Sequence, residues 1–302
     1  MSELGRRAFV AGCASAVLAS ATKPGRAEAS SPGLEVHDLE LDGNPHIARR
    51  ARLLLPKHEL ATGPLRLLVL LHGLGETGNP PLGLRAWSEL YGLVSSYGRL
   101  CHPPLERTLD KQRYLTDERK AALNASLAER PFVGFACVAP VTPNPHRVGP
   151  APQTLDRYAD WIESVLIPAV RARVSIAAAP WGIGLDGCSL GGYVGLEVLL
   201  RKPHLFGTFG MVQGAFGAAR AEDYAHRLAR ALDPSGARPL HLESSSEDPY
   251  RQANELLSQH LTQLGVPHTL RIPPGPHNQP WLREIGTLEM LLWHDRELLA
   301  YP

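Results

Sequence analysis

The segment Gly187-Cys188-Ser189-Leu190-Gly191 constrains the fold of this chain more than any other feature. Apolar residues in a pattern typical of a strand, 181–186, lead into it, and a helical pattern over 190–201 leads out. Glycines two residues before and two residues after Ser189 let the strand and the helix approach closely, so the turn between them can be very tight. Such a strand–turn–helix unit is typical of a parallel sheet covered by helices.

The rest of the chain also alternates between strand-like and helical segments. Residues 67–71 are all apolar, as expected of an inner strand that is covered on both faces of a parallel sheet. Two segments near the start, 34–41 and 46–55, alternate apolar and polar residues and predict a paired antiparallel edge. Further strands are expected over 132–138, 208–212, 239–243 and 268–272, and further helices over 155–168, 250–264 and 281–299. The pattern predicts one α/β domain over 30–302, with a mainly parallel central sheet flanked by helices.

A long stretch, 76–130, separates two of these expected strands. It is too long for one crossover, so we expect an insertion with structure of its own over the sheet edge. Residues 87–94 and 116–129 are both expected to be helical. Two interpretations stay open for Trp87 and Tyr91. Either they roof a site and select its substrate, or they are ordinary core residues.

The first thirty residues have the composition of an export signal. Arg6 and Arg7 precede an apolar stretch that is too short and too rich in small residues for a membrane span. The arginine pair followed by Phe9 resembles a bacterial twin-arginine signal. We expect residues 1–29 to be removed and the protein to be periplasmic or extracellular. An ordinary export signal or a disordered basic tail is the alternative.

The charge and the cysteines exclude several classes of partner. A formal net charge of +1 gives no electrostatic reason to expect nucleic acid or an anionic membrane. Stable membrane association would require lipidation of Cys13, which too little apolar sequence precedes. Cys101, Cys137 and Cys188 lack the close spacing of a zinc site. A disulfide between Cys101 and Cys137 is compatible with an oxidising compartment but not required by the sequence.

Ser189 is the candidate nucleophile, because the tight turn strains its backbone and exposes its hydroxyl. The same turn places the Leu190 N–H at a helix N-terminus, where it can bind a developing oxyanion. The loop His72-Gly73-Leu74-Gly75 follows the apolar strand 67–71 and is the candidate for a second donor. We assign the Leu74 N–H, with those of Gly73 and Gly75 as alternatives. A simple strand-ending turn is the other interpretation.

A general base and an acid are expected later in the chain. His277 lies in a loop rich in Pro and Gly after the last expected strand, and such a rigid loop can aim an imidazole at a serine. Glu243, Glu247 and Asp248 lie between the serine and the histidine. We prefer Asp248 as the acid, with Glu247 in reserve, although Asp248 is also well placed to cap the helix that follows.

These motifs resemble an esterase family of the α/β-hydrolase superfamily that includes esterase D-like enzymes, feruloyl-esterase-like enzymes and the mycolyltransferases. The resemblance covers roughly residues 65–293. It rests on Leu-Leu-His-Gly-Leu-Gly, Asp-Gly-Cys-Ser-Leu-Gly-Gly-Tyr, Pro-His-Leu-Phe-Gly, Glu-Asp-Pro-Tyr and Pro-Gly-Pro-His. It implies an α/β-hydrolase fold that acts on carboxylic esters, with Ser189, Asp248 and His277 at the positions of the family's triad. The long insertion and the displacement of Trp281 from the histidine depart from the family pattern.

The expected reaction is hydrolysis of a small-molecule or polymer-linked ester through an acyl-enzyme. It requires no metal and no organic cofactor. An acyltransferase with the same triad and a catalytically silent fold kept for binding are the alternatives. Peptidase activity is less favoured, because the sequence shows no charged pocket for a peptide terminus.

Overall fold

The computed structural model describes residues 33–57, 63–109, 111–232, 238–298 and 300. The expected export signal, residues 1–29, lies outside the described residues, and so does Cys13.

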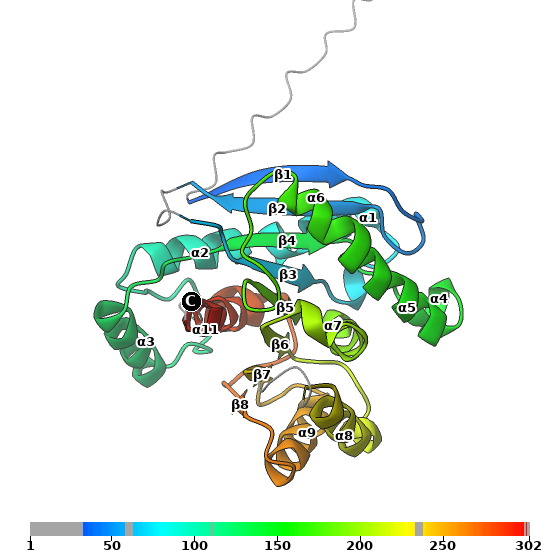
Figure 1. The fold of residues 1–302 in the computed structure, drawn as a ribbon. Helices are drawn as coiled ribbons and strands as arrows, with labels where there is room; N and C mark the ends of the chain where they lie inside the picture. Colours follow the sequence, from blue (N-terminus) through cyan, green and yellow to red (C-terminus); the bar gives the residue numbers. More distant parts are fainter. Residues whose placement is uncertain (1–32, 58–62, 110, 233–237, 299, 301–302) are drawn as a thin grey trace, which may run out of the picture. The chain divides into compact units, whose positions relative to one another are not determined.

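A central sheet of eight strands organises the described part of the chain (Figure 1). The strands are β1 (Leu34–Glu40), β2 (Arg50–Pro56), β3 (Leu67–Leu71), β4 (Ala136–Pro140), β5 (Ile183–Gly187), β6 (Thr208–Val212), β7 (Leu240–Glu243) and β8 (His268–Arg271). Their order in the sheet is β1-β2-β4-β3-β5-β6-β7-β8. β2 pairs antiparallel with β1 and β4, and the other pairings are parallel. The predicted antiparallel edge and parallel inner strands are therefore confirmed.

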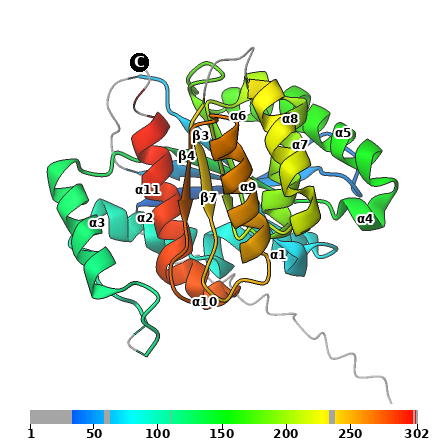
Figure 2. The ribbon, with the colours of Figure 1, turned by 90° about the horizontal axis from the view of Figure 1, so that it is seen from below.

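Helices cover both faces of this sheet (Figures 1 and 2). They are α1 (Pro80–Arg85), α2 (Leu93–Cys101), α3 (Asp117–Glu129), α4 (Pro145–Val148), α5 (Ala151–Trp161), α6 (Ile167–Arg171), α7 (Leu190–Arg201), α8 (Ala221–Leu232), α9 (Arg251–Gln263), α10 (Gln279–Trp281) and α11 (Thr287–Leu298). One core contains side chains of α5, α7, α8 and α9, and the other contains those of α2, α3 and α11. Alternate residues of β3 enter the two cores, as the pleat of a strand requires.

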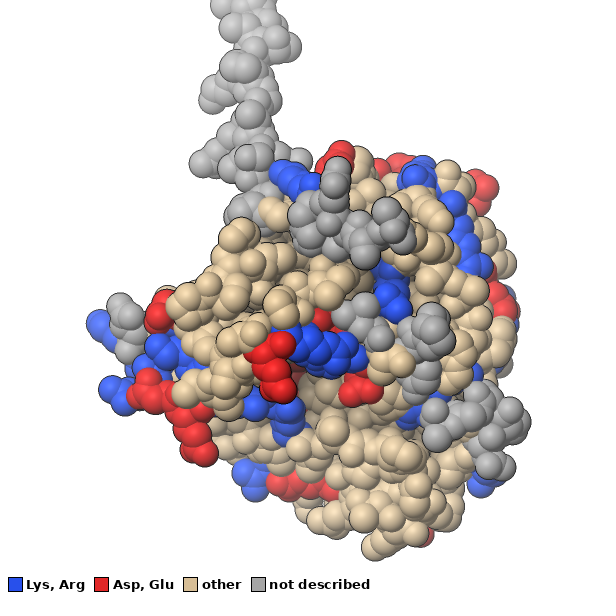
Figure 3. All heavy atoms as spheres, turned by 60° about the vertical axis from the view of Figure 1, so that its left-hand side comes forward, with Lys and Arg blue, Asp and Glu red and all other residues tan. Residues whose placement is uncertain are grey.

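The insertion between β3 and β4 lies on a face of the sheet, beside α11, rather than over the sheet edge. Leu93, Tyr97 and Leu100 of α2 share one apolar core with Leu68 and Leu70 of β3. The face that α2, α3 and α11 form carries Lys and Arg side chains interspersed with Asp and Glu (Figure 3).

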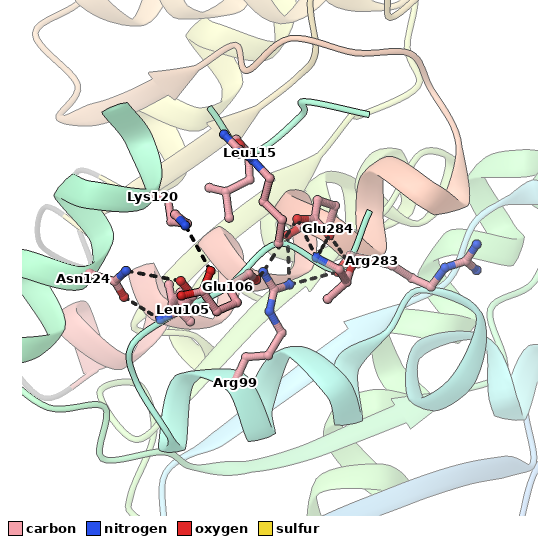
Figure 4. A network of polar contacts seen from close by, with 10 residues as sticks. Arg99, Leu105, Glu106, Leu115, Lys120, Asn124, Arg283 and Glu284 are labelled. Carbon is pink, nitrogen blue, oxygen red and sulfur yellow. Dashed lines mark hydrogen bonds and ion pairs between the residues drawn. The ribbon is translucent and has the colours of Figure 1, made fainter. Parts of the chain in front are cut away.

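A polar network ties the insertion to the segment Leu282–Gly286, which follows the His277 loop (Figure 4). Arg99 Nη1 donates to the Glu284 carbonyl at 3.0 Å, and Arg99 Nη2 donates to the Glu106 carbonyl at 2.8 Å. The Glu284 carboxylate is buried and accepts from the Thr108 N–H at 3.0 Å. Lys120 of α3 pairs with Glu106 at 3.0 Å. The loop between α2 and α3 is thus held between α3 and the segment that precedes α11.

Two predicted helices differ from the observed ones. The helix expected over 87–94 is a π-helical turn, Ala86–Leu90, followed by α2, because Gly92 adopts a left-handed conformation with φ 75° between them. The helix expected to end near Pro168 continues to Arg171. Proline lacks an N–H and crowds the carbonyl four residues earlier. A π-helical turn over Ile162–Leu166 widens the helix just before the proline and accommodates it.

The described cysteines Cys101, Cys137 and Cys188 are all free thiols, so Cys101 and Cys137 form no disulfide in this structure. Among the described residues, no helix is long and apolar enough to cross a membrane.

Candidate active site

Three side chains from separate loops meet at the carboxyl ends of the parallel strands. Ser189 follows β5, Asp248 follows β7 and His277 follows β8. His277 Nε2 lies 3.0 Å from Ser189 Oγ, and His277 Nδ1 lies 2.9 Å from Asp248 Oδ1. The three residues that sequence reasoning selected therefore form one hydrogen-bonded chain.

The turn that carries Ser189 is strained, as its two flanking glycines predict. Ser189 has φ 56° and ψ −118°, a conformation that few non-glycine residues adopt. A Cβ atom on Gly187 would lie 2.2 Å from the Gly191 carbonyl oxygen, and one on Gly191 would lie 2.1 Å from the Leu71 carbonyl oxygen. Only glycine fits at either position, so α7 starts directly against the ends of β3 and β5.

Asp248 is the carboxyl group in contact with His277, and its side chain is fully buried. Its Oδ2 accepts from Ser244 Oγ at 2.6 Å, and its Oδ1 also accepts from the Tyr250 N–H at 2.9 Å. These bonds fix the carboxylate independently of His277. Glu247 is exposed. Glu243 is buried without a hydrogen-bond partner among the described side chains, and burial raises its pKa well above the ordinary value.

Aromatic residues hold the His277 loop. Trp281 is fully buried, and its Nε1 donates to the Pro274 carbonyl at 3.1 Å. The same ring packs so close to Gly275, which has φ 129°, that a Cβ there would lie 2.5 Å away. The Tyr250 ring meets the His277 ring edge to face, with centroids 5.8 Å apart. Trp281, which lies four residues after His277, therefore supports the loop through its contacts with Pro274 and Gly275.

The loop after β3 brings Leu74 to the cavity beside Ser189, whereas Gly75 does not line that cavity. His72 is buried; its Nε2 accepts from the Thr142 N–H at 2.9 Å, and burial lowers its pKa, so the ring is neutral. The Gly73 N–H donates to Tyr91 Oη at 3.0 Å. Gly73 is therefore not the free donor. The Leu74 N–H and the Leu190 N–H have no acceptor among the described residues and border the same cavity.

Trp87 and Tyr91 are core residues, with exposed fractions of 0% and 3%. Their rings pack edge to face, 5.1 Å between centroids, beneath the loop after β3. Neither ring lines the cavity beside Ser189, so the interpretation of these two residues as a roof does not hold.

Sequence reasoning missed Gln213, which links the loops that carry Asp248 and His277. It follows β6 with φ 52°, and its side chain is buried. Gln213 Nε2 donates to Ser245 Oγ at 2.7 Å and to the Pro276 carbonyl at 3.2 Å. A polar residue directly after an apolar strand was the available signal, but nothing in the sequence shows its partners.

A cavity of about 500 Å³ opens beside the serine hydroxyl. Ser189, Leu74 and Leu190 line it. The other lining residues are Asn144, His146, Arg147, Tyr193, Ala215, Phe216, Gly217, Arg220 and Tyr250. Among the described residues, no three His, Cys, Asp or Glu side chains gather in a way that could hold a metal ion.

Comparison with solved structures identifies the fold of the chain. An S-formylglutathione hydrolase from Staphylococcus aureus superposes with a TM-score of 0.58 at 16% identity, over 87% of this chain and 98% of that one. A ferulic acid esterase superposes with a TM-score of 0.61 at 14% identity, over 88% and 99% of the two chains. The chain has the α/β-hydrolase fold.

Sequence comparison adds less to this α/β-hydrolase assignment. No family model matches the chain. The uncharacterized protein YbbA of Bacillus subtilis is 26% identical over 114 residues, which are 34% of this chain and 45% of that protein. The chain thus spans less than half the length of this relative.

Proposed function

We propose that this α/β-hydrolase is a serine esterase, which cleaves carboxylic esters through a covalent acyl-enzyme. The observation that carries the proposal is the hydrogen-bonded chain from Ser189 Oγ through His277 to Asp248, with distances of 3.0 and 2.9 Å. A nucleophile, a base within hydrogen-bond reach and a group that orients the base are the parts that this chemistry needs.

Ser189, His277 and Asp248 each have a definite role in the proposed mechanism. His277 Nε2 accepts the Ser189 proton as Oγ attacks the ester carbonyl. The buried Asp248 carboxylate holds His277 Nδ1–H and stabilises the imidazolium that forms. The Leu190 and Leu74 N–H groups bind the oxyanion. His277 then protonates the departing alcohol, and water, activated by the same imidazole, releases the acid from Ser189.

The names of the fold neighbours support the same class of substrate. They include S-formylglutathione hydrolases and ferulic acid esterases. We propose that this chain likewise takes a small or polymer-linked ester. Export by the N-terminal arginine pair is a separate proposal, and it is tested by following a tagged chain into the periplasm with Arg6 and Arg7 intact or replaced by Lys.

The proposed activity is tested with p-nitrophenyl esters from acetate to octanoate. The parent protein should hydrolyse part of the series, and Ser189→Ala should reduce turnover to background. The matched control is Ser164→Ala, which changes an exposed serine in the π-helical turn between α5 and α6. Product analysis with added alcohol separates hydrolysis from transfer. Equal, background rates for parent and Ser189→Ala across the series would contradict the proposal.

A further inference from the structure

The cavity beside Ser189 carries two cationic side chains. Arg147 and Arg220 line it, and no Asp or Glu is among its lining residues. A cavity lined by charges of one sign attracts ligands of the opposite sign, because its low-dielectric walls focus the field. The two arginines come from distant parts of the chain, Arg147 from α4 and Arg220 from the turn before α8.

Arg147 has no counter-charge in the described structure. No ion pair or side-chain hydrogen bond involves its guanidinium, although its backbone N–H donates to the Asn144 carbonyl at 3.0 Å. The neighbouring His146 ring stacks on the Tyr193 ring, 5.8 Å between centroids and 12° between planes. This stacking fixes the short helix α4 against the cavity wall.

Arg220 is held in place by contacts on its other side. Its guanidinium lies 4.5 Å from the centre of the Tyr224 ring and 5.8 Å from that of Tyr193. Its Nη2 is 3.3 Å from Glu197 Oε1, a carboxylate that Arg201 and Arg227 also contact. Because Arg220 shares this carboxylate with two other guanidinium groups, its own charge is only partly balanced.

The rest of the wall is aromatic. Tyr193, Phe216 and Tyr250 also line the cavity. Apolar rings next to guanidinium groups suit a ligand with an apolar or aromatic body and a charged end.

We propose that Arg147 and Arg220 form a subsite for an anionic group, such as a carboxylate, carried by the ester substrate. The inference rests on the proposed esterase function, because the ester carbonyl must reach Ser189 while the anion reaches the arginines. Planar guanidinium groups match a carboxylate with paired hydrogen bonds. The substrate class is therefore an ester that bears a second, ionised acid on its acyl or its alcohol part.

Matched pairs of esters test the subsite. On the acyl side, p-nitrophenyl adipate (a free carboxylate) is compared with p-nitrophenyl adipamate (a neutral amide of the same shape). On the alcohol side, meta-carboxyphenyl butyrate is compared with meta-carbamoylphenyl butyrate. The parent should prefer the carboxylate in at least one pair by about three- to tenfold in kcat/KM. Higher ionic strength should erode that preference, because salt screens exposed charges.

Variants then assign the preference to residues. Arg147→Gln removes no side-chain hydrogen bond or ion pair among the described residues, and it should abolish most of the preference for the carboxylate ester. Arg220→Lys keeps the positive charge but loses the planar guanidinium group, and it should reduce the preference for the carboxylate ester. Arg171→Gln, at the exposed end of α6, is the control and should change neither rate. Equal rates on carboxylate and amide in the parent would overturn the subsite and leave the esterase proposal standing.

A binding measurement separates the subsite from the activity. In the Ser189→Ala background, calorimetry should show meta-carboxyphenyl butyrate binding about three- to tenfold more tightly than its amide. Arg147→Gln should abolish the difference. If the parent hydrolyses no ester but this difference is present, the esterase proposal fails and the subsite stands. Equal binding of the two ligands would overturn the subsite whatever the activity.

Discussion

Tyr91 Oη donates a hydrogen bond to Glu76 Oε2 at 2.5 Å, and both residues are buried beneath the loop after β3. The same hydroxyl accepts from the Gly73 N–H at 3.0 Å. Gln279 Nε2, two residues beyond His277, lies 3.4 Å from Glu76 Oε1. Burial raises the pKa of Tyr91, so the phenol stays protonated and remains a donor. The pair thereby links the proposed oxyanion loop, the insertion and the His277 loop.

Tyr91→Phe should lower kcat by about tenfold with little change in KM. The variant leaves the Gly73 N–H without an acceptor, and a buried unsatisfied group costs about 1–3 kcal/mol. The loop can recover that loss only by turning, which moves the Leu74 N–H. Tyr97→Phe is the matched control, since that buried hydroxyl also accepts from a backbone N–H, that of Phe135 at 3.1 Å, just before the start of β4. It should affect the thermal midpoint alone. A fall in kcat of the same size in both variants would argue against a positioning role for Tyr91.

The assignment of the acid predicts unequal effects for neighbouring carboxylates. Asp248→Asn should reduce kcat by about 10³- to 10⁴-fold, because an amide no longer holds the catalytic tautomer of the histidine. Glu247→Gln should leave kcat within about twofold, since its side chain is exposed. Steady-state kinetics on the best p-nitrophenyl ester measures both. A large loss in the Glu247 variant with a small one in the Asp248 variant would reverse the assignment.

Asp186 and His294 form a buried pair just before the turn that carries Ser189, with 3.0 Å between Asp186 Oδ2 and His294 Nε2. Burial raises the pKa of Asp186 and lowers that of His294 to about 3, so the pair is neutral, with the carboxyl donating to Nε2. Asp186→Asn keeps a donor to His294 Nε2 and an acceptor for the Gly187 N–H. It should therefore change the free energy of unfolding by less than about 1 kcal/mol. Urea unfolding measures it. A loss of about 3–5 kcal/mol would instead indicate a buried ion pair.

Gly210 makes room for that pair. A Cβ there would lie 1.8 Å from Asp186 Oδ2, so Gly210→Ala should destabilise the fold by about 1–3 kcal/mol or more. Gly217→Ala is the control, because a Cβ at Gly217 meets nothing within 4 Å. Thermal unfolding compares the two variants. An unchanged midpoint for Gly210→Ala would mean that the pair can move aside.

Glu197 predicts a stability loss in acid. Burial alone would raise its pKa, but bonds from Arg227, Tyr224 and Arg201 outweigh burial and lower it from 4.5 to about 2. Because the folded pKa is below the unfolded one, its stabilisation is present above pH 4.5 and is lost as pH falls toward 2. We expect Glu197→Gln to cost about 1–3 kcal/mol at neutral pH.

The cost of Glu197→Gln should shrink steadily as pH falls through that window, because the protonated glutamate resembles glutamine. Urea midpoints of parent and variant at several pH values measure the difference. Glu129→Gln, an exposed residue at the end of α3, should give a difference that does not change with pH. A constant difference for Glu197→Gln would exclude a lowered pKa.

Local patterns were sufficient for the sheet and for the three residues of the hydrogen-bonded chain. The glycines around Ser189 and the proline-rich loop of His277 carry their geometry in a few adjacent residues, and the order of strands brings them together. The helix α8 was not predicted, although its residues Ala221, Tyr224, Ala225 and Leu228 are buried at helical spacing. That segment contains no motif, so its helical spacing of apolar residues is the one signal by which it could have been predicted.

Other features depend on contacts between distant residues and have no local pattern. The sequence shows no charged pocket, yet the fold gathers Arg147 and Arg220 at one cavity. Tyr91 is spaced like any core aromatic, and only the fold reveals that its hydroxyl reaches Gly73. Pairings of this kind are set by how the helices cross the sheet, and one sequence does not encode them in its periodicity.

The strand order has a consequence for when the site can form during synthesis. Both neighbours of β3, which are β4 and β5, emerge from the ribosome after it. The loop with His277 follows β8, the last strand, and rests on Trp281 near the end of the chain. A nascent chain that has exposed Ser189 therefore still lacks His277, the base in the proposed mechanism. Under that mechanism Ser189 cannot be activated before the segment that follows β8 has been made, so a product that stops earlier carries the strained turn without its proposed base.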